Sequence, residues 1–176
     1  ALERAERHGI ETFVVETSSY DDRAAWDTAL AEAVDAHSPD LVVLAGFMKL
    51  AGPAFLAKFG GRTLNTHPAL SPAFPGMHGP RDALAYGVKV TGATLFVVDE
   101  GVDTGPIILQ AAVPVHDDDT VETLAERVLA QEHELYSRAI GLYAAGCLRL
   151  EGRRVIIQPA GPGSSQKNKE ERGEGE

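Results

Sequence analysis

Cysteine is nearly absent from this sequence, because Cys147 is the only one in 176 residues. A single cysteine cannot form an intrachain disulfide, so a disulfide-stapled scaffold is excluded and a cytosolic setting is favoured. Long apolar runs are also absent: the longest, residues 41–48, is far shorter than the ~18 residues that a membrane span needs. We therefore expect a cytoplasmic protein without a membrane partner.

Basic side chains are in the minority, with 16 Lys and Arg against 26 Asp and Glu and a formal net charge of −10. Such a chain is a poor partner for nucleic acid, although a local basic pocket can still hold a small anion. No Gly-x-Gly-x-x-Gly or Walker sequence occurs, and no His, Cys or Asp stands at metal-site spacing from His67 or His78. We expect no bound metal.

Apolar residues are sufficient for one folded domain, at 44% of the chain. Residues 159–176 contain no Leu, Ile, Val, Phe, Tyr, Trp or Met, which predicts a disordered tail after a structured domain over residues 1–158. At the other end, the chain begins within what reads as the last turns of a helix, stopped by a glycine at position 9. We therefore expect this domain to be N-terminally incomplete.

The first half of the chain alternates strand and helix patterns, which is typical of a doubly wound α/β sheet. A strand is expected at 10–16, a helix from an N-cap at Ser18 or Ser19 to about residue 36, a strand at 40–46, a helix at 53–59 and a strand at 62–65. The strand at 40–46 is an unbroken apolar run, which predicts burial on both faces.

The second half predicts antiparallel strands added to that sheet. Two long strand patterns at 90–99 and 107–115 flank a turn-rich segment, and a short helix at 81–86 precedes them. Asp119 with Glu122 resembles a capping box that opens a helix to about residue 145. A small hairpin, residues 148–150 with 155–157, should follow.

His67 is the first candidate for chemistry, because it follows the strand at 62–65, and ligands of open α/β sheets bind beyond the carboxyl ends of the strands. Its imidazole can exchange protons near neutral pH. Alternation across Thr66 places Asn65 on the same side, so an amide donor and an imidazole could converge on one carbonyl. The alternative is a loop histidine and a turn-forming asparagine beside Pro68.

Two acidic residues are further candidates. Asp103 could orient an imidazole and raise its basicity, although an aspartate between two glycines is more often a turn former. Glu132 lies on the apolar stripe of its helix, three and four residues from Leu135 and Val128. A glutamate there is rare unless it is paired or bound to something; the alternative is a carboxylate that reaches out to solvent.

Several segments together resemble one family. They are Leu-Val-Val-Leu-Ala-Gly-Phe-Met at 41–48, Leu-Asn-Thr-His-Pro-Ala-Leu-Ser-Pro at 64–72, Phe-Pro-Gly-Met-His at 74–78, Val-Asp-Thr-Gly-Pro-Ile-Ile-Leu-Gln at 102–110 and Gln-Glu-His at 131–133. In order and spacing they are similar to the phosphoribosylglycinamide formyltransferases of the wider formyltransferase superfamily, over residues 1 to about 150. The resemblance implies a doubly wound, mostly parallel, Rossmann-like formyltransferase fold with antiparallel strands added in the C-terminal half.

The resemblance also implies an activity: transfer of the formyl group of 10-formyltetrahydrofolate, the formyl-donor cosubstrate, to the amine of glycinamide ribonucleotide in purine synthesis. Asn65, His67 and Asp103 match the catalytic positions. The positions that match folate contacts are Arg23, Met48, Lys49, Leu50, Ala51, Asn65, Asp99, Glu100, Gly101 and Val102. Pro68 and Glu132 match contacts to the nucleotide substrate, and a monomer or homodimer is implied.

One departure from the family is large, because the first βαβ unit, which carries a phosphate-binding loop, has no counterpart in this sequence. Two alternatives therefore stay open. The first is a formyltetrahydrofolate hydrolase of the same superfamily, which gives the formyl group to water. The second is a non-catalytic remnant that binds folate or a partner.

Overall fold

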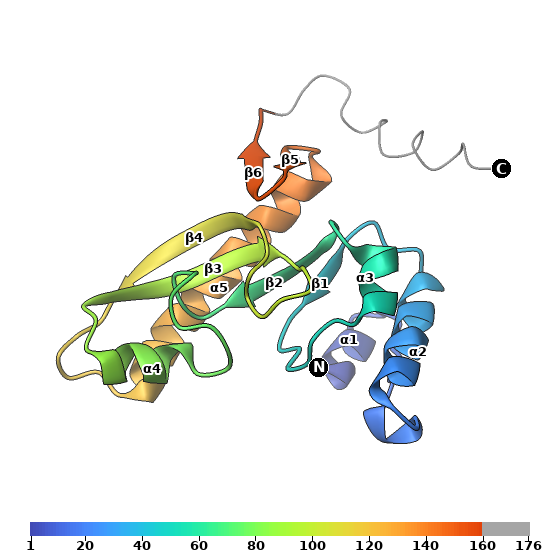
Figure 1. The fold of residues 1–176 in the computed structure, drawn as a ribbon, viewed down its shortest axis with the longest axis horizontal. Helices are drawn as coiled ribbons and strands as arrows, with labels where there is room; N and C mark the ends of the chain where they lie inside the picture. Colours follow the sequence, from blue (N-terminus) through green and yellow to red (C-terminus); the bar gives the residue numbers. More distant parts are fainter. Residues whose placement is uncertain (160–176) are drawn as a thin grey trace.

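The computed structural model describes residues 1–159 and contains a six-stranded sheet in the order β1-β2-β3-β4-β6-β5 (Figure 1). The strands are β1 (Val42–Leu44), β2 (Thr63–His67), β3 (Val90–Val97), β4 (Ile107–Pro114), β5 (Leu148–Glu151) and β6 (Arg154–Ile157). The helices are α1 (Leu2–Arg7), the 3₁₀ turn η1 (Thr17–Ser19), α2 (Arg23–Asp35), α3 (Pro53–Phe59), α4 (Gly79–Tyr86) and α5 (Val121–Ala144).

The sheet is mixed and belongs to the expected α/β class with antiparallel strands added, although among the described strands three pairings are antiparallel and two are parallel. β1 runs parallel to β2, while β3 pairs antiparallel with both β2 and β4. The β5–β6 hairpin joins the far edge, where β6 runs parallel to β4. The antiparallel strands thus lie in the C-terminal half, where two long strands around a turn-rich loop predicted them.

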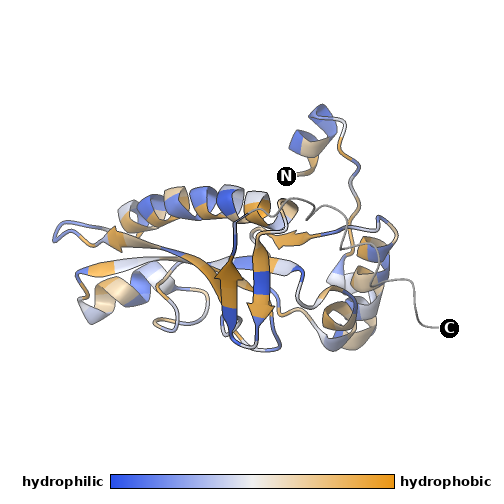
Figure 2. Ribbon diagram, turned by 90° about the horizontal axis from the view of Figure 1, so that it is seen from above, coloured by the Kyte–Doolittle hydropathy of each residue, from blue (hydrophilic) through white to orange (hydrophobic). Residues whose placement is uncertain are grey.

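The main core lies between α5 and the strands β3 and β4. α5 buries Leu124, Val128, Leu135 and Ala139, and these pack with Leu95 and other side chains of the sheet. Seen from above, α5 runs along the sheet with hydrophilic and hydrophobic residues alternating around it, as expected for a helix with one wet face (Figure 2). This packing fixes β3 next to β2, on which His67 lies.

A second, smaller core joins α2 to α3. Its buried residues are Ala31, Phe55 and Phe59, and the two phenyl rings of α3 lie 4.9 Å apart between centroids. Figure 1 shows both helices beside β1, on the side of the sheet away from β4. This unit is separate from the core under α5.

Two predictions for the N-terminal strands are wrong. Residues 10–16 form no strand, because no described strand lies beside them to accept their backbone hydrogen bonds. The apolar run at 40–46 forms only the three residues of β1, and Val43 at its centre is 36% exposed. Val43 points to the opposite face of the strand from Val42 and Leu44, so β1 is not buried on both faces. β1 is also an edge strand of the described sheet.

Several element ends differ from the predicted ones. Asp22, whose side chain accepts from the Ala25 amide at 2.8 Å, caps α2 in place of Ser18 or Ser19. The capping box of α5 pairs Thr120 with Thr123 in place of Asp119 with Glu122. β2 extends two residues further than expected, because its end pairs with β3, where His67 lies opposite Thr94.

The β5–β6 hairpin begins at a helix end, where Gly146 adopts a left-handed φ of 66° that favours glycine. The next residue, Cys147, is buried at the junction. None of the helices within residues 1–159 is both long and apolar enough to cross a membrane. The predicted disordered tail falls, except for Pro159, outside the described residues.

Candidate functional site

His67 is almost fully buried at the end of β2, with 2% of its surface exposed. Its Nδ1 lies 3.3 Å from Oδ2 of Asp103, and its Nε2 lies 2.7 Å from the Phe74 carbonyl oxygen. A backbone carbonyl can only accept, so the Nε2 contact requires a proton on that nitrogen. A carboxylate also accepts, so an imidazolium with both nitrogens protonated satisfies both contacts.

Asp103 lies in the loop between β3 and β4 and adopts a left-handed φ of 54°, which aspartate tolerates better than most residues. Its Oδ2 also accepts from the Gly76 amide at 2.8 Å. The loop is braced internally, because Asp99 Oδ1 accepts from the Thr104 hydroxyl at 2.6 Å. Both readings of Asp103 therefore apply: it makes a turn, and that turn places its carboxylate against His67.

Asn65 is the neighbour of His67 across one residue of β2 and pairs in register with Phe96 of β3. Both Asn65 and His67 line one cavity, as strand alternation predicts. Phe96 is buried and forms part of the same wall. The amide, the imidazole and the carboxylate therefore belong to residues that line one cavity, and the imidazole and the carboxylate are in contact.

The cavity has a volume of about 690 Å³, within the roughly 300–1,000 Å³ typical of small-molecule sites. It opens at the carboxyl ends of the parallel pair β1 and β2, where ligands of such sheets bind. Of the residues predicted for ligand binding, the cavity brings together Met48, Lys49, Leu50, Ala51, Asn65, Pro68, Asp99, Gly101, Val102 and Glu132. Glu100 is exposed and does not line it, and neither does Arg23.

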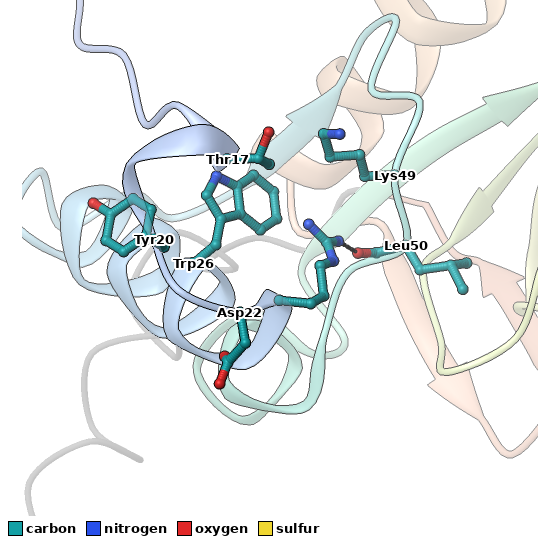
Figure 3. A pocket seen from close by; sticks show the side chains of 7 residues that line it. Thr17, Tyr20, Asp22, Trp26, Lys49 and Leu50 are labelled. Atoms are coloured by element: carbon teal, nitrogen blue, oxygen red, sulfur yellow. Dashed lines mark hydrogen bonds between the residues drawn. The ribbon is translucent and has the colours of Figure 1, made fainter.

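Arg23 lines a second pocket of about 500 Å³, between α2 and the loop after β1. Its guanidinium lies 4.0 Å from the centroid of the Trp26 ring and donates to the Leu50 carbonyl, the bond drawn at Leu50 in Figure 3. Lys49 reaches over this pocket toward Trp26 (Figure 3). Because Lys49 and Leu50 line both pockets, the two pockets adjoin, and they share one cationic side chain, that of Lys49, while Arg23 lines the second pocket alone.

Glu132 and Tyr136 lie one turn apart on α5, and both line the main cavity. Glu132 is half-buried there, so its place on the apolar stripe points it toward the cavity wall. The Tyr136 hydroxyl donates to the Leu44 carbonyl at the end of β1. Burial raises the pKa of this phenol, which therefore stays a donor at neutral pH.

Sequence reasoning missed three kinds of contact. The sequence could have indicated Tyr136 as a cavity residue, since it stands four residues after Glu132 on the same helix face. No sequence pattern could have indicated the Phe74 carbonyl and the Gly76 amide, because they are backbone groups of an irregular loop. The same is true of Asp27, which contacts residues more than 20 positions away.

No three His, Cys, Asp or Glu side chains of residues 1–159 are grouped so that they could hold a metal ion.

The chain is similar to several known proteins. The sequence profile of the family described as formyl transferase matches residues 1–140. The chain is 54% identical to the phosphoribosylglycinamide formyltransferase of Mycobacterium tuberculosis over 157 residues, which is 89% of this chain and 73% of that protein.

Solved structures are similar as well. Glycinamide ribonucleotide transformylase 1 from Symbiobacterium toebii superposes with a TM-score of 0.88 and 52% identity, over 90% of this chain and 74% of that one. A formyltetrahydrofolate deformylase from Pseudomonas syringae has a TM-score of 0.84 at 25% identity, over 90% of this chain and 53% of that one. Sequence identity is thus higher to the transferases than to the deformylase.

Proposed function

The chain belongs to the formyl transferase family, and on that premise we propose that it transfers the formyl group of 10-formyltetrahydrofolate to the amine of glycinamide ribonucleotide, a step of purine synthesis. The single observation that carries the proposal is that one ligand-sized cavity is lined by Asn65 and by the contacting pair of His67 and Asp103. The identity of 54% to a named phosphoribosylglycinamide formyltransferase supports the choice of acceptor.

The reaction joins the amine nitrogen to the formyl carbon and breaks the bond from that carbon to the folate nitrogen. The amine loses a proton, the folate nitrogen gains one, and negative charge develops on the formyl oxygen on the way. Asn65 donates its amide N–H to this oxygen, a contact whose loss typically costs ~10²–10³ in rate. The Asp103 carboxylate holds His67 in place, and the imidazolium stabilises the charge and exchanges protons.

The two pockets suggest how the cosubstrate lies. The main cavity is lined by apolar side chains that suit an aromatic ring system, those of Met48, Leu50, Ala51 and Phe96, and residues of the 99–103 loop line it as well. Arg23 and Lys49 in the adjoining pocket suit the carboxylates at the other end of a folate. The chain is acidic overall, so these two cations supply the local attraction that an anionic ligand needs.

The nucleotide side of the cavity is formed by α5 and the end of β2. The Glu132 carboxylate can only accept, so it suits the hydroxyl groups of a ribose, and Pro68 lies against the same space. The expectation that a preceding βαβ unit holds the phosphate stays a prediction. The cytoplasmic setting and the monomer or homodimer also stay predictions.

Absorbance of formyl-folate, followed with and without glycinamide ribonucleotide, tests the proposal. We expect consumption only when the nucleotide is present, and a loss of about 10²–10⁴-fold in His67→Ala, the range for a lost acid–base group. Turnover that His67→Ala leaves unchanged would sink the mechanism. Consumption that ignores the nucleotide would instead identify a hydrolase, and binding of formyl-folate without any consumption would identify a non-catalytic binder.

A further inference from the structure

Three side chains on one face of α2 contact the loop at residues 47–52. Arg23 donates to the Leu50 carbonyl, and the Trp26 ring stacks on Phe47 with centroids 6.2 Å apart. Asp27 accepts from the Gly52 amide at 2.8 Å. Positions 23, 26 and 27 share a helix face, so α2 holds this loop at both ends and near its middle.

Asp27 is the deepest of these contacts, with only 3% of its surface exposed. Its Oδ2 also accepts from the Ala54 amide at 2.9 Å and the Phe55 amide at 3.2 Å, in the first turn of α3. The N-cap residue of α3 is Gly52, which has no side chain to cap it. A carboxylate from another helix therefore satisfies amides that would otherwise lack partners, and the helix N-terminus in turn stabilises the buried charge.

The position of the Asp27 carboxylate leaves no room for a side chain at Gly52. A Cβ at this position would lie 2.3 Å from Asp27 Cγ and 2.4 Å from its Oδ2. The φ of Gly52 is −86°, which any residue adopts, so the backbone itself does not require glycine. Close approach of the carboxylate is what excludes a larger residue.

We propose that Asp27 is a positioning residue for the cosubstrate: by binding the Gly52 and α3 amides, it fixes the backbone of the loop that ends at Gly52. Residues 48–51 of this loop line the main cavity, and Lys49 and Leu50 also line the second pocket. This inference rests on the proposed function, since it assigns the loop to formyl-folate. It predicts a defect in cosubstrate affinity, whereas His67, Asn65 and Asp103 lie on other elements and keep their geometry.

The test measures formyl-folate binding and turnover in Asp27→Ala and Asp27→Asn. Trp26 is the only tryptophan of the chain and packs against Phe47, so its fluorescence reports the dissociation constant in the absence of the nucleotide. We expect the Kd and the KM for formyl-folate to rise about tenfold or more in Asp27→Ala, the effect of losing one hydrogen bond to a charged group, and less in Asp27→Asn. The KM for the nucleotide should stay within about twofold.

The reciprocal variant makes the test specific. Gly52→Ala alone should weaken formyl-folate binding about as much as Asp27→Ala, because the new methyl group displaces the carboxylate. In an Asp27→Ala background the methyl group has room, so Gly52→Ala should add less than a twofold effect, far from additivity. Additive effects of the two changes would contradict the proposed contact.

Thr120→Ala is the matched control, since it removes a helix N-cap at the start of α5, and Thr120 does not line either pocket. It should lower the denaturation midpoint without changing either KM. The inference is overturned if Asp27→Ala and Gly52→Ala lower only the denaturation midpoint, or if they raise both KM values alike. If the wild type is active and the Asp27 and Gly52 variants bind formyl-folate as tightly as it does, this inference alone is rejected. If the wild type binds no formyl-folate, the proposed function is rejected as well.

Discussion

The two sides of the main cavity are built differently. On one side, His67 and Asn65 lie on β2, whose neighbour β3 is buried under α5 in a core of eleven buried residues. On the other side, residues 48–52 belong to a loop that packs with α2 and α3, whose own core has three buried residues. The reacting groups therefore stand on the stiffer side, and the wall proposed for the cosubstrate stands on the side with fewer buried contacts.

This difference separates catalysis from affinity. A group that must meet a reacting atom within a fraction of an ångström is best placed on a strand that a packed core holds. A wall that must admit a large ligand can belong to a loop held at a few points, here by Arg23, Trp26 and Asp27. Substitutions on the β2 side should lower kcat, whereas those on the α2 side should raise the KM for formyl-folate.

Asp103→Ala should have the largest effect. The change removes the carboxylate that holds His67 Nδ1 and the Gly76 amide, so we expect kcat to fall by about 10²–10⁴-fold, as for other groups of an acid–base pair. The KM for formyl-folate should change much less. Steady-state kinetics with both substrates measure the two constants, and an unchanged kcat would break the division of the cavity into two sides.

Leu124→Ala should be the most damaging change to stability on the β2 side. Leu124 is fully buried in the core under α5, and such truncations cost about 2–5 kcal/mol. Urea denaturation measures this loss. At temperatures where the variant stays folded, its kcat and both KM values should match the wild type, because Leu124 lines neither pocket.

Arg23→Met should act on affinity alone. The change keeps much of the side-chain volume but removes the guanidinium from the Leu50 carbonyl and from the face of Trp26. We expect the KM for formyl-folate to rise about tenfold, the usual cost of one charge-assisted contact, with kcat within about twofold. A tenfold fall in kcat with an unchanged KM would contradict the assignment of Arg23 to the side of the cavity that sets affinity.

The smallest expected effect is on the pH dependence of stability. Arg127 donates to both carboxylate oxygens of Asp119, at 2.9 and 2.7 Å, and holds the pKa of that carboxyl well below its ordinary value of 3.8. A lowered pKa adds stability that is fully present above pH 3.8 and is lost as the pH falls through the folded-state value. Arg127→Met should therefore be less stable than the wild type at pH 7, and the gap should narrow below pH 3.8; a gap that is constant down to pH 2.5 would contradict this.

Local sequence patterns predicted most of the sheet and, within the site, the placement of Asn65 and His67 on one side of a strand. α3 was predicted with its observed ends, because a proline at its start and a glycine after its end mark them in the sequence. β3 and β4 were predicted as an antiparallel pair from their lengths and the turn between them. Asn65 and His67 could be placed on one side because the period of a strand is two residues.

The rest depended on contacts that no local pattern encodes. Residues 10–16 have the composition of a strand, but a strand exists only where a neighbour accepts its hydrogen bonds. Asp27 reads as an ordinary polar residue of an amphipathic helix, and only the approach of residues 52–55 makes it a buried acceptor. Glu100 was carried over from the family with its neighbours, yet it is exposed and does not line the cavity.

The buried thiol at the junction of α5 with the β5–β6 hairpin has a practical consequence. Cys147 is the only cysteine, and it lies in a hairpin whose Arg153 donates to the Thr104 carbonyl at 2.7 Å, beside Asp103. A thiol reagent can reach it only when this corner opens, so at reagent concentrations where labelling is faster than reclosing, the labelling rate of the native protein gives the rate of that opening. The protein therefore carries its own probe of opening at the junction of α5 with the hairpin.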